Sequence, residues 1–254
     1  MSNIFKYLGH AGFFISNDNY VFIMDPWFSP KGAYYSGWYQ WPPNQYILEN
    51  IIKEISDNEK KLYIYISHEH EDHFCNFTLQ KLADIKKITF IIPYYEEKSF
   101  EKSIKEKFKD NNTILVIKDK ESFLFEDSKI TLFVDDKGIN HDSAIFYESA
   151  KFNFFNQNDC KIFDRLDEVK KINTNIDFYA CQYSGANWHP STFIMDENLK
   201  NNISNKRNFQ KFQNIKESIR KLACRNYIAS AGPVCFLDPK EDFINRNVYN
   251  FPDS

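Results

Sequence analysis

The sequence has no run of apolar residues that approaches the roughly 20 needed to cross a bilayer. Its N-terminus, MSNIFKYLGH, has no basic segment followed by an apolar one, so we expect no secretory signal peptide. The five cysteines include no C-x-x-C pair, and their odd number argues against a disulfide framework. These absences predict a cytoplasmic protein with reduced thiols and no membrane partner.

The sequence also lacks a strong excess of charge of either sign. The formal net charge is −3, and no basic stripe or acidic tail is present, so we expect no nucleic-acid partner. Apolar residues make up 43% of the 254 residues, which is enough to bury a sizeable core. With no internal repeat and no low-complexity linker, we expect one domain over residues 1–254. The sequence does not indicate the oligomeric state.

Short apolar segments that read as strands alternate with segments of helical periodicity. We expect strands at 4–8, 12–16, 20–25, 62–67, 88–93, 113–118, 122–126, 129–135, 143–149, 152–156, 178–182 and 227–232. We expect helices at 46–56, 77–82, 96–109 and 164–170, and a long one ending near residue 224. The long helix has an apolar face made of Phe209, Phe212, Ile215, Ile219 and Leu222. Hairpins in both halves predict an α/β (α+β) fold, an αββα sandwich of two mixed sheets flanked by helices.

One short motif concentrates the histidines. Three of the chain's six fall between His68 and His73, directly after the apolar segment LYIYIS. Alternate residues of a strand share a face, so His68 and His70 should point to one place, and Asp72 and His73 in the following turn to a second. Such pairs suit two divalent transition metals. The alternative is a charged, solvated turn, which the scarcity of histidine elsewhere argues against.

A metal site needs further ligands, and two distant segments offer them. His141 and Asp142 lie just before an expected strand, and Asp159 lies just after the next one. His141 could complete the site begun by His68 and His70, and the Asp159 carboxylate could bridge two metals. Each of these residues alone would also suit an ordinary loop or turn.

These residues together resemble the metallo-β-lactamase fold superfamily, whose most specific motif is H-x-H-x-D-H. Nearly the whole chain is similar to the catalytic portion of CMP-N-acetylneuraminate hydroxylase-like proteins. The similar segments, in the same order, are LGHAGFFISNDNYVFIMDPWFS, GAYYSGWYQWPPNQ, YISHEHEDHF, HDSAIFYE, FNQNDC and YSGANWHPSTF. The resemblance implies the αββα fold and a dinuclear site holding divalent iron or zinc, with manganese as a third option. The ligands it implies are His68, His70, Asp72, His73, His141 or its neighbour Asp142, and Asp159.

The resemblance also implies supporting residues around the site. Asp25, in MDPW, would fix the tautomer of a ligand imidazole. His10, in LGHAG, would lie near the metals, unless it is a histidine whose polar atoms are satisfied by backbone. The aromatic loop 27–46, which includes Trp38, and the segment with Trp188 would form pocket walls, or else a packed loop that seals the edge of the sandwich.

Two features depart from the superfamily. Most of its hydrolases have a last histidine ligand after the final strands, where this sequence reads SAGPVCFL. Either His189 replaces that ligand, or the second metal keeps open positions for water, dioxygen or substrate. The hydroxylase-like proteins also carry a Rieske iron–sulfur domain, whereas this sequence has no C-x-H…C-x-x-H pair. An oxygenase built on this chain would therefore need a separate electron-transfer partner.

The sequence leaves three functions open, each with a small-molecule substrate. The first is an iron-dependent oxygenase that hydroxylates a sugar- or acyl-amide-like substrate, and the missing last histidine favours it. The second is a hydrolase in which Asp72 and Asp159 hold a metal-bridging hydroxide. The third is a binding protein that has kept the fold. The catalytic residues expected are Asp72, Asp159 and His189. Lys206 and Arg207, early in the long helix, could hold a carboxylate or phosphate, or form a solvated face.

Overall fold

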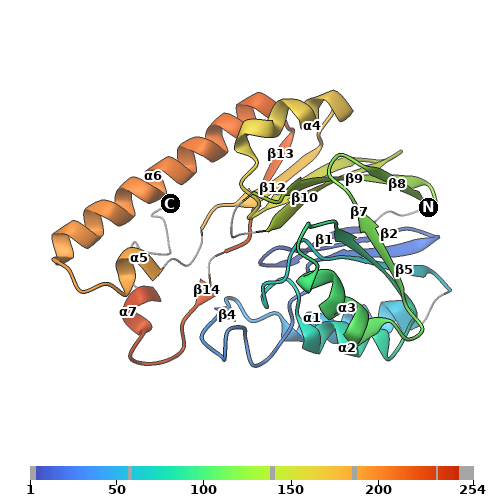
Figure 1. Cartoon of the computed structure of the whole chain (residues 1–254), viewed down its shortest axis with the longest axis horizontal. Coiled ribbons are helices and arrows are strands. Elements are labelled where there is room, and N and C mark those ends of the chain that lie inside the picture. Colours follow the sequence, from blue (N-terminus) through green and yellow to red (C-terminus); the bar gives the residue numbers. More distant parts are fainter. Residues whose placement is uncertain (1–3, 57–58, 138–140, 185–187, 233, 246–254) are drawn as a thin grey trace.

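The computed structural model describes residues 4–56, 59–137, 141–184, 188–232 and 234–245. Two six-stranded sheets face each other, and helices cover their outer faces (Figure 1). The predicted αββα sandwich is therefore confirmed. All five cysteines are unpaired, in agreement with the expectation of free thiols. Among the described helices, none combines the length and the apolar character needed to span a bilayer.

The first sheet joins an antiparallel N-terminal meander to a parallel half. Its strands, in spatial order, are β1 (Ile4–Gly9), β2 (Gly12–Ser16), β3 (Tyr20–Met24), β5 (Lys61–Tyr65), β6 (Ile88–Pro93) and β7 (Thr113–Ile117). The pairs β3–β5, β5–β6 and β6–β7 are parallel. The helices on its outer face are α1 (Gln45–Ser56), α2 (Asn76–Ala83) and α3 (Ser99–Phe108), at the bottom of Figure 1. They are the connections that parallel neighbours require.

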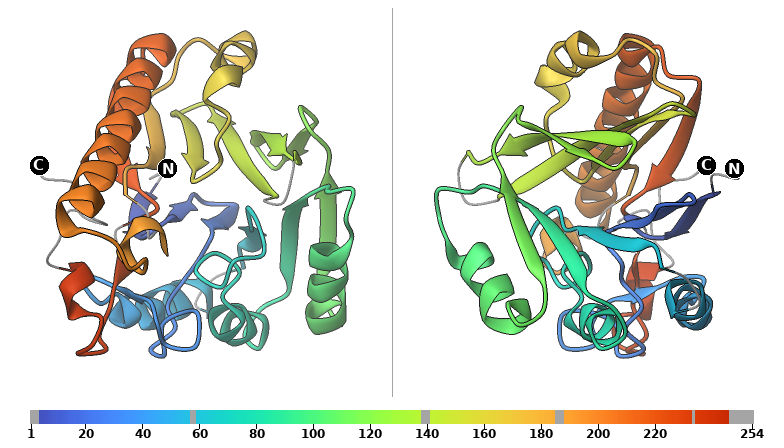
Figure 2. Two further views of the ribbon diagram at one scale, coloured as in Figure 1. Left: turned by 60° about the vertical axis from the view of Figure 1, so that its left-hand side comes forward. Right: turned by 90° about the vertical axis from the view of Figure 1, so that its right-hand side faces the viewer.

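The second sheet mirrors this plan. In spatial order its strands are β13 (Asn226–Ser230), β12 (Phe178–Gln182), β11 (Asn153–Asn158), β10 (Asp142–Ser149), β9 (Ser128–Asp135) and β8 (Ser122–Phe125). The pairs β11–β12 and β12–β13 are parallel. Helices α4 (Leu166–Ile172) and α6 (Glu197–Leu222) cover its outer face, as both views of Figure 2 show. The remaining short elements are β4 (Tyr39–Gln40), η1 (Phe163–Arg165), α5 (Trp188–Ser191), β14 (Val234–Cys235) and α7 (Asp242–Asn245).

Aromatic side chains fill the space between the sheets. The ring centroids of Phe13 on β2 and Phe154 on β11 lie 4.8 Å apart. Those of Phe22 on β3 and Tyr147 on β10 lie 6.0 Å apart. Such pairs contribute roughly 0.5–1.5 kcal/mol each beyond the burial of their area. The buried hydroxyl of Tyr20 lies 2.6 Å from that of Tyr147, so these polar atoms are hydrogen-bonded inside the core. The core therefore fixes how the two sheets lie across from each other.

The long helix only partly follows its predicted apolar face. Ile215 and Leu222 are buried against the second sheet, and Phe212 packs beside them. Phe209 is instead 63% exposed, so the expected face holds only for the C-terminal half of α6. The N-terminal half extends past the strands of this sheet (Figure 1), and α6 contacts α5 there.

The topology brings chemically active residues to one edge of the sandwich. Parallel strands end at the same edge of a sheet, and the chain continues from β3 into Asp25 and from β5 into the motif that begins at His68. From the facing sheet, β11 ends directly before Asp159. These three strand ends supply most of the site described next.

Candidate metal centre

A first group of possible ligands consists of His68, His70 and Asp159, whose ligand atoms all lie within 4.8 Å of one another. The Nε2 atom of His68 lies 2.8 Å from Nδ1 of His70 and 3.9 Å from Oδ2 of Asp159. His68 is buried, whereas His70 is exposed. The two histidines converge as expected, but β5 ends at Tyr65, so the bend after the strand brings them together. We call these three residues cluster A.

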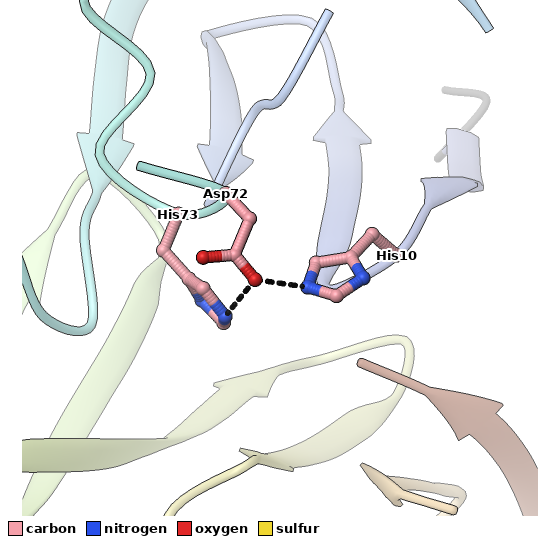
Figure 3. Close-up of side chains that lie close together, drawn as sticks. All are labelled: His10, Asp72 and His73. Carbon is pink, nitrogen blue, oxygen red and sulfur yellow. Dashed lines mark ion pairs between the residues drawn. The ribbon is translucent and has the colours of Figure 1, made fainter. Parts of the chain in front are cut away.

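A second group, cluster B, consists of His10, Asp72 and His73, all of them buried. Figure 3 shows the Asp72 carboxylate between the two imidazole rings. Its Oδ2 atom lies 2.9 Å from Nε2 of His10 and 3.8 Å from Nε2 of His73. His10 comes from the turn between β1 and β2, so this cluster joins the N-terminal hairpin to the turn after β5.

Asp159 faces both clusters. Its Oδ1 atom lies 3.4 Å from Nε2 of His73, and its Oδ2 atom lies 3.9 Å from Nε2 of His68. One carboxylate thus points one oxygen at a histidine of each cluster. This geometry suits the bridging role expected from the sequence, which stays a prediction.

Asp25 holds the turn after β5 and orients one ligand ring. Its carboxylate is fully buried and accepts hydrogen bonds from the Ser67 amide (2.8 Å) and the Ser67 hydroxyl (2.7 Å). Nδ1 of His73 lies 3.0 Å from the same carboxylate. A carboxylate at Nδ1 keeps the imidazole proton on that nitrogen. The lone pair of Nε2 is then directed at Asp72 and Asp159.

The structure separates His141 from Asp142. Asp142 Oδ1 lies 3.2 Å from Nδ1 of His68, so this carboxylate orients His68 much as Asp25 orients His73. His141 turns away, with its Nδ1 2.5 Å from Asp136 Oδ1, and it joins neither cluster. Neighbouring residues of an extended chain point to opposite sides, so only one of the two can face the site.

Three residues of the site have left-handed backbone conformations that side chains rarely adopt. They are His10 (φ 49°), Asp25 (φ 40°) and Asn158 (φ 43°). Each such conformation costs on the order of 1–3 kcal/mol and persists only where its surroundings fix it. The Asn158 side chain donates to the Ser143 carbonyl (2.9 Å) and accepts from the Asp159 amide (2.5 Å), which fixes the turn that presents Asp159.

Several buried polar atoms of the clusters have no hydrogen-bond partner among the described residues. They are Nδ1 of His10, and Nε2 of His73 and Oδ1 of Asp159, which face each other at 3.4 Å. Nε2 of His10 is paired with the Asp72 carboxylate at 2.9 Å and is not counted with them. An unsatisfied buried polar atom costs about 1–3 kcal/mol, so such atoms are rare without a function. A divalent metal would accept the lone pairs of imidazole and carboxylate, and these donors fit iron or zinc.

Comparison with protein families identifies the fold family. Residues 5–142, more than half of the chain, match the model of the β-lactamase superfamily domain. The chain belongs to this superfamily. The recognition of the metallo-β-lactamase fold from the histidine motif is therefore confirmed.

Curated relatives of this superfamily member are longer proteins. A protein named as a Rieske 2Fe–2S iron–sulfur protein in Mycolicibacterium smegmatis is 26% identical over 238 residues, which cover 92% of this chain and 44% of that one. A protein of the same name in Mycobacterium tuberculosis is 26% identical over 253 residues, with 94% and 45% covered. The chain thus spans somewhat less than half the length of these relatives.

Solved structures with the same fold include two kinds of enzyme. CmlA, a diiron β-hydroxylase from Streptomyces venezuelae, has a TM-score of 0.61 at 14% identity, covering 91% of this chain and 45% of that one. An isothiocyanate hydrolase from Delia radicum gut bacteria has a TM-score of 0.51 at 11% identity, covering 91% and 97%. At these identities the likeness shows the fold alone. The family, the fold and the two clusters together support a metal-dependent enzyme whose reaction type they leave open.

The charge states differ among the possible ligands. Although His70 as a whole is exposed, desolvation of its ring lowers its pKa to about 4, with His68 acting in the same direction, so this imidazole is neutral at pH 7. Burial alone would raise the pKa of Asp72, but His73 and His10 outweigh it and keep the carboxylate ionised. Burial alone would lower the pKa of His68 and of His73, but Asp142 and Asp159 outweigh it and raise both, which favours the protonated rings. Because imidazoles bind metals in their neutral form, a metal would have to displace these protons.

A cavity of about 550 Å³ opens on the His70 side and is lined also by Tyr34, Glu69 and Glu71. Tyr34 was not anticipated as a site residue, although it belongs to the aromatic loop expected to wall the pocket. Its hydroxyl donates to Asp72 Oδ1 (3.0 Å). Burial and the Asp72 carboxylate raise the pKa of this phenol, so it stays a donor. The Trp38 ring meets the Tyr34 ring edge to face, with centroids 4.5 Å apart.

The structure does not bring His189 into either cluster. Its exposed ring packs against Phe193, with centroids 5.0 Å apart, and its backbone carbonyl accepts from Arg207. The side chain of Trp188 lies outside the described residues. His10, rather than His189, brings a further imidazole to cluster B.

Proposed function

We propose that clusters A and B each hold an iron ion and that the protein is an oxygenase hydroxylating a small polar substrate, such as a sugar or an acyl amide. The observation that carries this proposal is the composition of the clusters. Each offers two imidazoles and one carboxylate, with no third histidine among the described residues. A set of two histidines and one carboxylate with open positions is typical of non-haem iron oxygenases.

The comparisons favour redox chemistry over the other reactions of the fold. Relatives that match nearly all of this chain are named as Rieske iron–sulfur proteins, and a Rieske cluster carries electrons. CmlA, with a TM-score of 0.61, is named as a diiron β-hydroxylase. Hydroxylation by dioxygen places one oxygen atom in the substrate and reduces the other to water, which needs an external pair of electrons. We therefore propose a separate electron-transfer partner.

The bound metals would supply the activation of dioxygen, and the protein's own residues prepare and shield the site. Asp25 and Asp142 orient His73 and His68 through their Nδ1 atoms. Tyr34 donates to Asp72 and so limits how its carboxylate can turn. Asp159 is held between the clusters by the turn that Asn158 fixes. These contacts preorganise the ligands without any further rearrangement.

A metal-dependent hydrolase is the second candidate, because the same donors also suit zinc. Two histidines and a carboxylate with one open position form a common catalytic zinc site. Zinc ions would lower the pKa of a shared water enough for it to attack an ester, amide or phosphoester at neutral pH. This function needs no reductant. The alignment with the isothiocyanate hydrolase of the same fold covers 97% of that enzyme. Its name implies no electron carrier.

Metal identity decides between the two. We would purify the protein without chelators and measure its metals by elemental analysis, then record absorption spectra after reduction and after exposure to air. Iron at one ion per cluster, with a spectrum that changes between the two states, supports the oxygenase. Zinc, with an absorption spectrum that does not change on reduction, supports the hydrolase. Protein that binds neither metal would refute both.

A further inference from the structure

A second cavity borders Asp159 and is lined by different residues from the cavity at His70. It has a volume of about 290 Å³ and lies between α6 and the ends of β11 and β12. Asp159 and Cys181 line it from the sheet, and Arg207 and Lys211 line it from the helix. This volume is near the lower end of the roughly 300–1,000 Å³ typical of ligand pockets. The cavity therefore suits a small molecule, or one end of a larger one.

Three cations line this cavity: the exposed Lys161, and Arg207 and Lys211, which lie side by side on α6. Arg207 and Lys211 are four residues apart on α6 and so lie on the same face of the helix, one turn apart. Lys211 donates to the side-chain oxygen of Gln182 (3.2 Å), and Arg207 donates to the backbone carbonyl of His189. Both partners are neutral. The ion pairs of the described residues include neither cation.

An unpaired cation inside a protein is unfavourable unless an anion accompanies it. Burial lowers the pKa of Lys211 to about 8, so its ammonium group is mostly protonated at neutral pH despite the cost. The guanidinium of Arg207 adds a second positive charge to the same wall. A planar guanidinium beside an ammonium group is well suited to a carboxylate or a phosphate.

The other cavity has the opposite character. On the His70 side, Glu69 and Glu71 line the wall together with one cation, Lys107, so carboxylates outnumber cations there and disfavour an anion. Asp159 also carries a negative charge, but it faces His68 and His73, which offset it. The cations of α6 thus mark the side on which an acidic molecule would approach the clusters.

We propose that Lys211 and Arg207 bind an anionic group, a carboxylate or a phosphate, of the substrate on which the metal centre acts. This inference rests on the proposed function and narrows its substrate class to small acids. Because Asp159 lines the same cavity, a molecule anchored at the two cations places its remainder against the clusters. Lys206, paired with Arg207 in the sequence-based expectation, is exposed and does not line the cavity, so it offers a matched control.

The test is calorimetric titration of the full, metal-loaded chain with inorganic phosphate and, separately, with succinate. We would compare the wild type with Lys211→Met, Arg207→Met and the control Lys206→Met. Hydrogen bonds to a charged group contribute about 1.5–3 kcal/mol, so each of the first two variants should weaken binding roughly 10- to 100-fold. The control should bind as the wild type does. Lys211→Arg, which keeps the charge, should retain most of the affinity.

The outcomes separate the possibilities. Tighter binding of phosphate identifies a phosphate ester as the substrate class, and tighter binding of succinate identifies a carboxylic acid. Unchanged affinity in both methionine variants, as expected if anions bind only to the metals, would overturn the proposal. So would the absence of binding in the wild type. Metal content and melting temperature, measured in parallel, show whether each variant is folded and loaded. Wild-type protein that binds no metal would refute the proposed function. Metal-loaded variants that still bind anions with wild-type affinity would refute only the anion subsite.

Discussion

Replacing Asp25 with asparagine tests how a buried carboxylate prepares cluster B. Asp25 has no solvent exposure and lies 3.0 Å from Nδ1 of His73, which leaves Nε2 free for a metal. An asparagine that keeps its oxygen on the Ser67 amide presents its NH₂ group to Nδ1 of His73. The imidazole must then accept at Nδ1 and carry its proton on Nε2. In that tautomer Nε2 has no lone pair for a metal.

The size of the effect follows from the contacts that change. Loss of a group that orients a ligand typically lowers metal affinity roughly 10- to 100-fold, or about 1.4–2.7 kcal/mol. Stability should also fall, because hydrogen bonds to a charged acceptor are replaced by neutral ones. The difference is about 1 kcal/mol for each of the affected bonds. Cluster A should be much less affected, because Asp142, not Asp25, contacts its His68.

The assay is competition between the protein and a chelator of known affinity, with metal content followed by elemental analysis. Asp25→Asn should lose one metal equivalent at a chelator concentration where the wild type keeps both. Asp18→Asn is the matched control, because Asp18 is exposed in the turn before β3. Wild-type affinity for both metals in Asp25→Asn protein with an unchanged melting temperature would refute the role given to this carboxylate.

Four further predictions use the same protein. His70→Ala should strip metal from cluster A while the fold survives, because this side chain is exposed; unchanged metal stoichiometry would remove it from the ligand set. His10→Gln should lower the affinity for one of the two metals roughly tenfold or more in chelator competition. Unchanged affinity would mean that His10 is not a ligand. His189→Ala should leave the metal content intact, and loss of an equivalent would make it the missing ligand. Above neutral pH, succinate affinity should fall progressively as Lys211, whose pKa is about 8, loses its proton. Lys211→Arg should show no such fall.

Much of the fold follows from the alternation of apolar segments. The apolar residues 20–24, for example, form β3, which is buried along its length between antiparallel and parallel neighbours. The pairing of His68 with His70 agrees with the sequence expectation, although β5 ends at Tyr65 and a bend brings the two rings together. Asp159 could be expected near them because strand ends of facing sheets meet at one edge. These inferences depend only on local periodicity and on the end of a strand.

Other features required contacts that local sequence does not encode. The choice between His141 and Asp142 depends on where β10 begins and on its pairing with β9, since a shift of one residue exchanges the two sides. His10 reaches Asp72 only because its backbone is left-handed, a conformation that no rule for histidine predicts. Tyr34 reaches the site through a long loop whose path depends on tertiary packing. Phe209 fits a helical period but is exposed.

Several features of the site lower the stability of the folded state, and favourable packing elsewhere must offset this free energy. Left-handed residues precede or belong to both clusters, and unsatisfied nitrogen and oxygen atoms face one another within them. Each of these features costs about 1–3 kcal/mol, and together they are comparable to the about 5–15 kcal/mol by which a typical domain is stable. The aromatic core between the sheets holds the strand ends in place regardless of the metals. A metal bound to the clusters would return free energy by satisfying these atoms.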